Sequence, residues 1–276
     1  MKISIILIIT FLFTINSPLG AHQFKTKNDS LNCHINKAYI KTLATDFVPI
    51  VISPIHWNNK QWIGAGAVLG TAAFLYSKDK VIADFWQQHR STALDNADKY
   101  FFDPFGKMYY TIPLMGAFYL YGAASHKNKP KRVAMDFVQA SLYSGIIVTI
   151  VKNIGHRHRP FQTKNHNPYL WDGPLTQDWG HNSFPSGHTI MAFTFASVIA
   201  THYQKTVWVP IIAYSLASME AMARMYADKH WSSDVLIGGA MGYAIGTFVV
   251  NRNHYRIKTI PIISGNFTGL SFIYSL

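Results

Sequence analysis

The sequence is poor in cysteine and in charge of any kind. One cysteine, Cys33, stands among 276 residues, so an internal disulfide is excluded and cysteine use says nothing about the redox compartment. Only 14% of the residues are charged, whereas 49% are hydrophobic and 14% are aromatic. That is more apolar surface than most soluble chains carry, and it indicates a single domain at a membrane.

Acidic residues are scarce as well, 13 against 25 lysines and arginines, which gives a formal net charge of +12. A chain of this charge attracts anionic lipid or a phosphorylated substrate. The sequence has no nucleic-acid-binding motif and no face of aromatic and basic residues, so no nucleic acid is expected as a partner. No obligate protein partner is evident either.

Three short stretches, each beside a long apolar segment, describe a phosphate site. The first runs from Lys152 to Arg159 and Pro160: a cation ends an apolar run, and the proline keeps the guanidinium out of a helix. The second places the Ser186 hydroxyl and the Cβ-free Gly187 just before an apolar run. Unpaired N–H groups at such a helix start can bind phosphate.

The third stretch supplies another cation, Arg224, followed by His230 and Asp234. Because the last two are four residues apart, we expect them on one face of a helix. The carboxylate can then accept one ring N–H and leave the lone pair of the other nitrogen free. The spacing therefore predicts an oriented nucleophile or base.

These stretches, Lys-x6-Arg-Pro, Pro-Ser-Gly-His and Arg-x5-His-x3-Asp, match the signature of the type 2 phosphatidic acid phosphatases, the PAP2 superfamily. The chain resembles that superfamily in motif from Lys152 to Asp234, and three ordered motifs are far more specific than one. The resemblance implies a helical bundle of the kind shared with the haloperoxidases. The family usually has serine before the third motif's arginine, whereas this chain has Ala223, so a supporting hydrogen bond is expected to be missing.

The resemblance implies that five residues bind the phosphoryl group. Lys152, Arg159 and Arg224 would hold its oxygens, with help from the Ser186 hydroxyl and the Gly187 N–H. The physics of the reaction agrees, because phosphoryl transfer leaves negative charge on the equatorial oxygens and needs fixed cations and donors. Each charge-assisted hydrogen bond of this kind contributes about 1.5–3 kcal/mol.

The resemblance assigns the chemistry to three residues. His230 would attack phosphorus, Asp234 would fix the tautomer of His230, and His188 would donate a proton to the leaving oxygen. Water would then release phosphate from a phosphohistidine. Neither a metal nor a cofactor is implied.

Each motif alone has a plainer interpretation. Cations at helix ends anchor proteins at membrane interfaces, Pro-Ser-Gly commonly forms a turn, and a His-x3-Asp pair commonly lies solvated on a helix. The order and spacing of all three together favour the functional interpretation.

Additional histidines raise the alternative of a zinc site. His156, His158 and His181, together with an aspartate, are a plausible set of ligands. Arg157, Arg159 and the two other site cations would repel a dication and attract a dianion, so no metal is expected. The histidines then either add pH-dependent positive charge or serve as polar groups of a loop.

Residues 1–21 have the pattern of a bacterial secretory signal: a lysine, the apolar run Ile3–Ile15, a proline and a small-residue cleavage site. An uncleaved membrane anchor is the alternative, because the run is long for a signal and short for a span. Residues 22–60 are predicted to form a flexible polar lead-in and an interfacial segment, Phe47–Ile55, which is too short and too rich in proline to span easily.

Residues 61–252 are predicted to form an all-α bundle of about six core helices, whose small residues let the helices approach closely. The polar, aromatic-rich stretch Ser77–Lys107 is expected to lie as a helix along the interface, or as a soluble excursion. The tail, residues 253–276, alternates apolar residues like a short β-hairpin. The helices are expected at Trp62–Tyr76, Met108–Ala124, Val133–Val151, Thr189–His202, Val207–Met222 and Val235–Val250.

If these helices span a membrane, their parity puts the three motifs on one side and the basic loop 127–132 on the other. Positive loops prefer the cytoplasm, so the site is expected to face the periplasm of a bacterial envelope. A cleaved signal conflicts with this count. The first helix, 15 residues long, also reaches only about 22 Å against a hydrocarbon core of about 30 Å. A soluble periplasmic bundle is therefore the alternative.

The sequence thus predicts a metal-independent envelope phosphatase that hydrolyses a phosphomonoester or a pyrophosphate. The expected substrate is a lipid such as phosphatidate, phosphatidylglycerophosphate, undecaprenyl diphosphate or lipid A, and a single sequence does not say which. The alternatives are a soluble non-specific acid phosphatase, a vanadium haloperoxidase, which the family resembles, and a non-catalytic binder or transporter of lipid phosphates.

Overall fold

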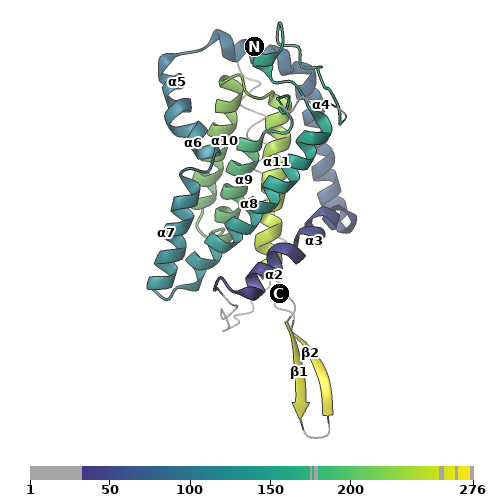
Figure 1. Ribbon diagram of the computed structural model, residues 1–276, viewed down its shortest axis with the longest axis vertical. Coiled ribbons are helices and arrows are strands. Elements are labelled where there is room, and N and C mark those ends of the chain that lie inside the picture. Colours follow the sequence, from purple (N-terminus) through teal and green to yellow (C-terminus); the bar gives the residue numbers. More distant parts are fainter. Residues whose placement is uncertain (1–32, 175, 177–179, 255–257, 265–266, 274–276) are drawn as a thin grey trace. The chain divides into compact units, whose positions relative to one another are not determined.

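The computed structural model describes residues 33–174, 176, 180–254, 258–264 and 267–273. Helices make up nearly all of this part of the chain, which confirms the predicted all-α class (Figure 1). The expected signal segment, residues 1–21, lies outside the described residues.

The long helices correspond to the apolar segments of the sequence, and most extend beyond the predicted bounds, whereas α7 begins at Thr111 and is shorter than predicted. Helix α9 lies in the middle of the bundle and packs against α8, α10 and α11 (Figure 1). Helix α7 packs on α8, and α4 packs on α11. These helices are α4 (Asn59–Gln88), α7 (Thr111–Ala124), α8 (Asn128–Gly155), α9 (Gly187–His202), α10 (Trp208–Tyr226) and α11 (Ser232–His254).

The region predicted as a flexible lead-in is helical from Lys37, so that prediction is wrong for its second half. The Asn36 side chain accepts a hydrogen bond of 3.0 Å from the Tyr39 N–H and starts the first helix. The two prolines fall in the first turns of the next helices, where a missing N–H is tolerated. The elements are α2 (Lys37–Thr45), α3 (Phe47–Ile52) and the 3₁₀ turn η1 (Ser53–His56).

The expected boundary at Tyr76 is also wrong, because α4 continues to Gln88 and is 30 residues long. No proline or glycine interrupts it between Thr71 and Gln88, so the charged residues there do not end the helix. Three short helical elements follow in place of one interfacial helix. They are α5 (Thr92–Ala97), the π-helical turn η2 (Asp98–Phe102) and α6 (Asp103–Gly106).

Three described helical stretches are long and apolar enough to cross a membrane: Lys37–His56, Asn128–Gly155 and Ser232–Asn253. Helix α8 carries a stripe of exposed apolar side chains one turn apart, with exposed fractions between 37% and 57%. Such a stripe suits contact with lipid tails. We call it the α8 stripe; it consists of Val138, Leu142, Ile146, Ile150 and Ile154.

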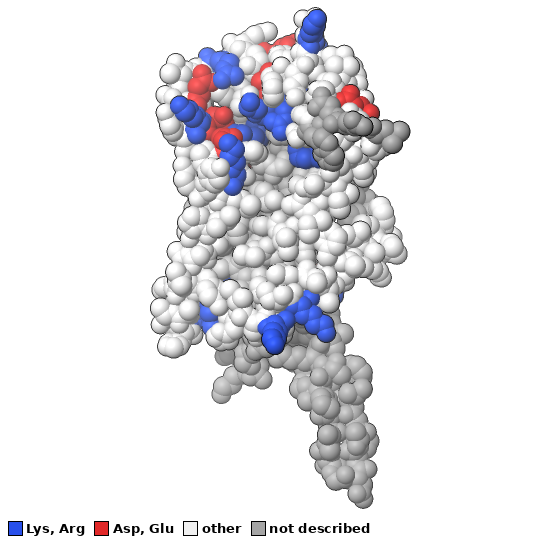
Figure 2. All heavy atoms as spheres, in the orientation of Figure 1, with Lys and Arg blue, Asp and Glu red and all other residues white. Residues whose placement is uncertain are grey.

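Charged side chains gather near the two ends of the helices, and on the face drawn in Figure 2 a band without charge separates them. Figure 1 shows the turn between α7 and α8 at the opposite end of the bundle from the loop between α8 and α9. Lys131 and Arg132 lie in the first turns of α8, and Arg252 lies near the end of α11. This end, opposite the phosphate motifs, is the basic end.

The predicted C-terminal hairpin is confirmed by the backbone. Strand β1 (Lys258–Ser264) pairs antiparallel with β2 (Phe267–Ile273), and Lys258 lies opposite Ile273.

Candidate active site

The ends of four helices bring the three sequence motifs together. Lys152 lies in the last turn of α8, and Arg224 lies in the last turn of α10. Ser186 is the N-cap of α9, whose first residue is Gly187, and Asp234 lies in the first turn of α11. Helix α9 packs on the other three, so these ends meet at one end of the bundle (Figure 1).

Lys152 and Arg159 converge on one residue, Asn182. Lys152 Nζ donates to its backbone carbonyl. The Arg159 guanidinium donates to its side-chain oxygen from Nε at 3.2 Å and from Nη2 at 2.6 Å. Arg159 immediately precedes the 3₁₀ turn η3 (Pro160–Gln162), as the proline predicted. The two cations of the first motif thus point toward two oxygens of the same residue.

The start of α9 faces the same place. A Cβ on Gly187 would lie 3.7 Å from Lys152 Cε, so the first two motifs are in contact. Ser186 is completely buried, and its hydroxyl lies 2.9 Å from that of Thr189. A Cβ on Gly238 would lie only 2.8 Å from the Ser186 carbonyl oxygen, so glycine lets α11 approach the N-terminus of α9.

His230 lies outside α11, which begins at Ser232, so the prediction that His230 and Asp234 share a helix face is wrong. The His230 ring is buried, and its Nδ1 lies 2.8 Å from the backbone carbonyl of Ser183. A carbonyl can only accept, so Nδ1 carries the proton and the lone pair is on Nε2. The backbone carbonyl of Ser183, and not the Asp234 carboxylate, therefore orients the His230 ring.

The environment keeps His230 neutral. Burial lowers the pKa of His230 well below its ordinary value of 6.5, and the charges of Lys152, Arg159 and Arg224 lower it further. A histidine whose protonation is resisted so strongly presents a free lone pair at neutral pH.

Asp234 supports His230 indirectly. Its Oδ2 accepts from the Ser183 hydroxyl at 2.5 Å and from the Trp231 N–H at 3.0 Å. Ser183 provides the carbonyl for His230, and Trp231 is the next residue after it. The carboxylate therefore fixes both neighbours of the imidazole rather than the ring.

Arg157, absent from the predicted site, is the centre of a buried network. Its guanidinium bonds to Asp234 Oδ1 at 2.5 Å and to Asp79 Oδ2 at 2.8 Å. The rings of Tyr76, Trp171 and Trp231 lie within 5.3 Å of its Cζ.

Asp79, in α4, is also completely buried and accepts from Ser232 and Ser233 as well. Because Asp79 stands between two lysines in a charged stretch of the sequence, nothing in the local composition marks it as a buried partner of Arg157.

Arg224 is surrounded by carboxylates that do not belong to the predicted site. It bonds to Asp98, and its Nη1 lies 2.9 Å from Asp103 Oδ1. Its Nε lies 3.1 Å from Oε1 of Glu220, which is one turn earlier in α10 and fully buried. The glutamate inside an apolar helix was the available signal.

His188, in the first turn of α9, lies against the same acidic group. Its Nε2 is 3.3 Å from Asp103 Oδ1. A Cβ on Gly106 would lie 2.6 Å from the ring, so this glycine lets the end of α6 approach the histidine. His188 and Arg224 therefore share the Asp103 carboxylate, and the third motif is linked to the second.

The profile of a family described as the PAP2 superfamily matches residues 133–258. The chain is 39% identical over 66 residues to the lipid A 1-phosphatase of Porphyromonas gingivalis, which covers 24% of this chain and 15% of that protein. It is 27% identical over 167 residues to the probable diacylglycerol pyrophosphate phosphatase 1 of Schizosaccharomyces pombe, which covers 49% of this chain and 59% of that protein. The chain thus spans less than two thirds of the length of either relative.

A solved structure is also similar. The crystal structure of a transmembrane PAP2-type phosphatidylglycerolphosphate phosphatase from Bacillus subtilis aligns with 76% of this chain and 94% of that chain. The identity is 20% and the TM-score is 0.47.

Proposed function

This chain belongs to the PAP2 superfamily, and we propose that it is a membrane phosphatase that hydrolyses a phosphomonoester or pyrophosphate of a lipid, without a metal or cofactor. One observation carries the proposal: a buried, neutral His230 lies in the combined field of Lys152, Arg159 and Arg224. A nucleophile inside a cluster of cations suits an anionic phosphorus centre. The phosphatase domain is proposed to span residues 61–252.

His230 Nε2 forms a bond to phosphorus as the bond to the leaving oxygen breaks, and His188 gives that oxygen a proton. The Ser183 carbonyl accepts the hydrogen bond of the Nδ1–H, which becomes more acidic as positive charge develops on the ring. Water then attacks the phosphohistidine, its proton passes to His188, and the N–P bond breaks to release phosphate. Each proton that His188 gives is therefore returned.

The phosphoryl oxygens are proposed to lie between the first two motifs. Lys152 and Arg159 donate to the oxygens of Asn182, and a phosphate offers the same kind of acceptor with more charge. The N–H groups at the start of α9, with Gly187 and the Ser186 hydroxyl, would complete the cradle. Arg224 would exchange one of its carboxylate contacts for a phosphoryl oxygen.

The lipid class is inferred from the relatives and from the surface. The two relatives above are named for lipid A and for diacylglycerol pyrophosphate. Ile150 and Ile154 of the α8 stripe are more than half exposed and, being two residues from Lys152, point to the other side of the helix. The stripe thus offers lipid tails an apolar surface on the outside of α8. Phosphatidate, phosphatidylglycerophosphate, undecaprenyl diphosphate and lipid A are the candidate substrates.

We propose that the site faces outward, toward the periplasm of a bacterial envelope. The basic end, with Lys131, Arg132 and Arg252, lies opposite the site, and positively charged loops prefer the cytoplasm. Tyr39 donates to the Met135 carbonyl and Asp46 pairs with Arg252, so α2 begins at the basic end. This placement conflicts with a cleaved signal, which would leave residue 22 on the opposite side.

The test is phosphate release in detergent without added metal, from wild type and from His230→Ala. The panel contains phosphatidate, polyprenyl diphosphate, lipid A and an aryl phosphate, and His56→Ala serves as a control at an exposed histidine. We expect wild type and the control to release phosphate from at least one lipid and His230→Ala to release none. Activity on the aryl phosphate alone would favour a soluble acid phosphatase.

Two other results would replace the proposal. Equal release by wild type and His230→Ala, or release by neither, would favour a non-catalytic binder or transporter. Halide oxidation that depends on added vanadate would assign the chain to the haloperoxidases.

A further inference from the structure

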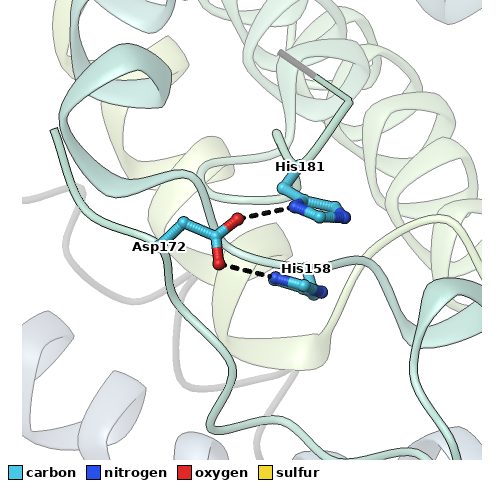
Figure 3. A group of neighbouring side chains, drawn as sticks. All are labelled: His158, Asp172 and His181. Carbon is cyan, nitrogen blue, oxygen red and sulfur yellow. Dashed lines mark hydrogen bonds and ion pairs between the residues drawn. The ribbon is translucent and has the colours of Figure 1, made fainter. Parts of the chain in front are cut away.

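His158, Asp172 and His181 meet in the loop between α8 and α9. The His158 Nε2 lies 3.0 Å from one carboxylate oxygen of Asp172, and the His181 Nδ1 lies 2.6 Å from the other. The two imidazole rings are stacked, with centroids 3.5 Å apart and an angle of 19° between their planes. Figure 3 shows both rings on the same side of the carboxylate, one above the other.

These three residues satisfy the first requirements of a metal site. One ligand atom from each residue lies within 4.8 Å of the other two. Among the described residues, this is the one group of three or more histidines, cysteines and acidic residues that meets this distance. Zinc bonds of about 2.0–2.2 Å place tetrahedral ligands about 3.4 Å apart. To admit the ion, the carboxylate must move away from both nitrogens and the stacked rings must turn so that their lone pairs converge. The side chains are 18% to 30% exposed, so an ion can enter from solvent.

Arginines near these histidines would repel a dication, and the structure removes part of that repulsion. Arg157, which precedes His158, is neutralised by the carboxylates of Asp79 and Asp234. Arg159 keeps its charge, and Asp172 contributes a negative ligand. Of the three histidines considered from sequence, His156 is the C-cap of α8 and is not part of this group.

We propose that His158, Asp172 and His181 bind one divalent cation of the zinc class. Two imidazoles and one carboxylate are ligands that Zn²⁺ prefers, and with three protein ligands a fourth position remains for water. Binding requires that His158 Nε2 and His181 Nδ1 offer their lone pairs, so the N–H of each neutral ring must lie on its other nitrogen. The site has only three protein ligands, and the Arg159 cation lies nearby. Its affinity for zinc is therefore lower than that of a structural zinc site with four protein ligands.

The proposed ion would tie together the two segments that hold the cations of the first motif. His158 precedes Arg159 and His181 precedes Asn182, and these neighbours are joined by hydrogen bonds of 2.6 and 3.2 Å. A metal clip between His158 and His181 would therefore fix the position of Arg159. Its effect would be on the stability of this loop, apart from the reacting atoms.

The test is metal binding by tag-free protein in detergent, after chelation and without substrate, so it is independent of the proposed phosphatase activity. Co²⁺ is titrated and followed by its visible absorption, and Zn²⁺ is titrated by calorimetry. We expect one ion per chain and a higher unfolding temperature with Zn²⁺. Asp172→Asn and His181→Gln should lose both, whereas His56→Ala, an exposed histidine outside the cluster, should keep both.

Absence of one-to-one binding by wild type would overturn the proposal. The same holds if both cluster variants bind as wild type does, or if His56→Ala loses binding, because the ion would then lie elsewhere. Only variants that elute as a single species are compared, so that misfolding is not mistaken for loss of a ligand. Asp172→Asn also preserves the shape of the side chain, so loss of Co²⁺ absorption in this variant reports on the carboxylate ligand.

Discussion

Arg157 Nη1 lies 2.5 Å from Asp234 Oδ1, and neither side chain has exposed surface. The pair connects the loop after α8 to the first turn of α11. Asp234 in turn binds the Ser183 hydroxyl, and the Ser183 carbonyl holds His230. The nucleophile proposed here is therefore positioned by a buried chain of contacts that starts at an arginine of the first motif's loop.

Asp79→Asn should destabilise the protein strongly. It would leave Arg157 with one carboxylate partner in a buried site, and breaking a buried pair in this way costs about 3–5 kcal/mol. The measurement is the thermal unfolding temperature in detergent. Asp84→Asn is the matched control, since Asp84 is in the same helix but is 36% exposed, and its loss should cost less than about 1 kcal/mol. Equal effects of the two variants would contradict the network.

Lys152→Met should move the acid limb of the pH dependence of kcat/KM to higher pH. The charge of Lys152 helps to lower the pKa of His230, so its removal raises that pKa toward 6.5 and protonates the nucleophile at higher pH. The residual activity of the variant is measured from about pH 3 to about pH 9. Lys80→Met, at an exposed lysine of α4, should not shift the limb. A shift to lower pH would contradict the assignment.

Asn182→Asp should reduce kcat/KM by about 10- to 100-fold. The new carboxylate would form charge-assisted bonds with Arg159, each worth about 1.5–3 kcal/mol, and would compete with the phosphoryl group for the same cation. Asn182→Ala removes the acceptor without adding charge and should lose less activity. If alanine and aspartate reduce kcat/KM equally, Asn182 does not mark the position of the phosphate.

Leu142→Lys should reduce membrane association. Leu142 is in the middle of the α8 stripe and is 44% exposed, and lysine at the centre of a spanning helix costs about 2.5–3.5 kcal/mol. The measurement is the fraction that remains in membranes after an alkaline wash, with Leu142→Ala as the control. A soluble bundle would tolerate lysine at this position. If wild type is itself found in the soluble fraction, and Leu142→Lys behaves in the same way, the soluble alternative is supported.

The existence of the long helices follows from the sequence, because apolar runs of this length have few other ways to fold. Their bounds do not follow so easily. The charged residues around Asp79 suggested the end of a helix at Tyr76, yet α4 continues because Asp79 is satisfied by a partner 78 residues away. Tertiary pairing of this kind cannot be read from local composition.

The convergence of the three motifs could be predicted from the sequence, whereas the contacts of the candidate site residues could not. The motifs identify Lys152, Arg159 and His230, and the structure brings them into one field. The acceptor for His230 is a backbone carbonyl, which leaves no signature in a sequence. The carboxylates around Arg224 come from η2, α6 and α10, and only the fold brings these segments together.

The most direct test is to trap the covalent intermediate. Wild type is mixed with an aryl phosphate, quenched in alkali, where phosphohistidine survives, and digested for mass spectrometry. The account predicts one phosphoryl group on the peptide that contains His230, and none in His230→Ala. Turnover without a phosphorylated residue, or a phosphoryl group on any other residue, would contradict it.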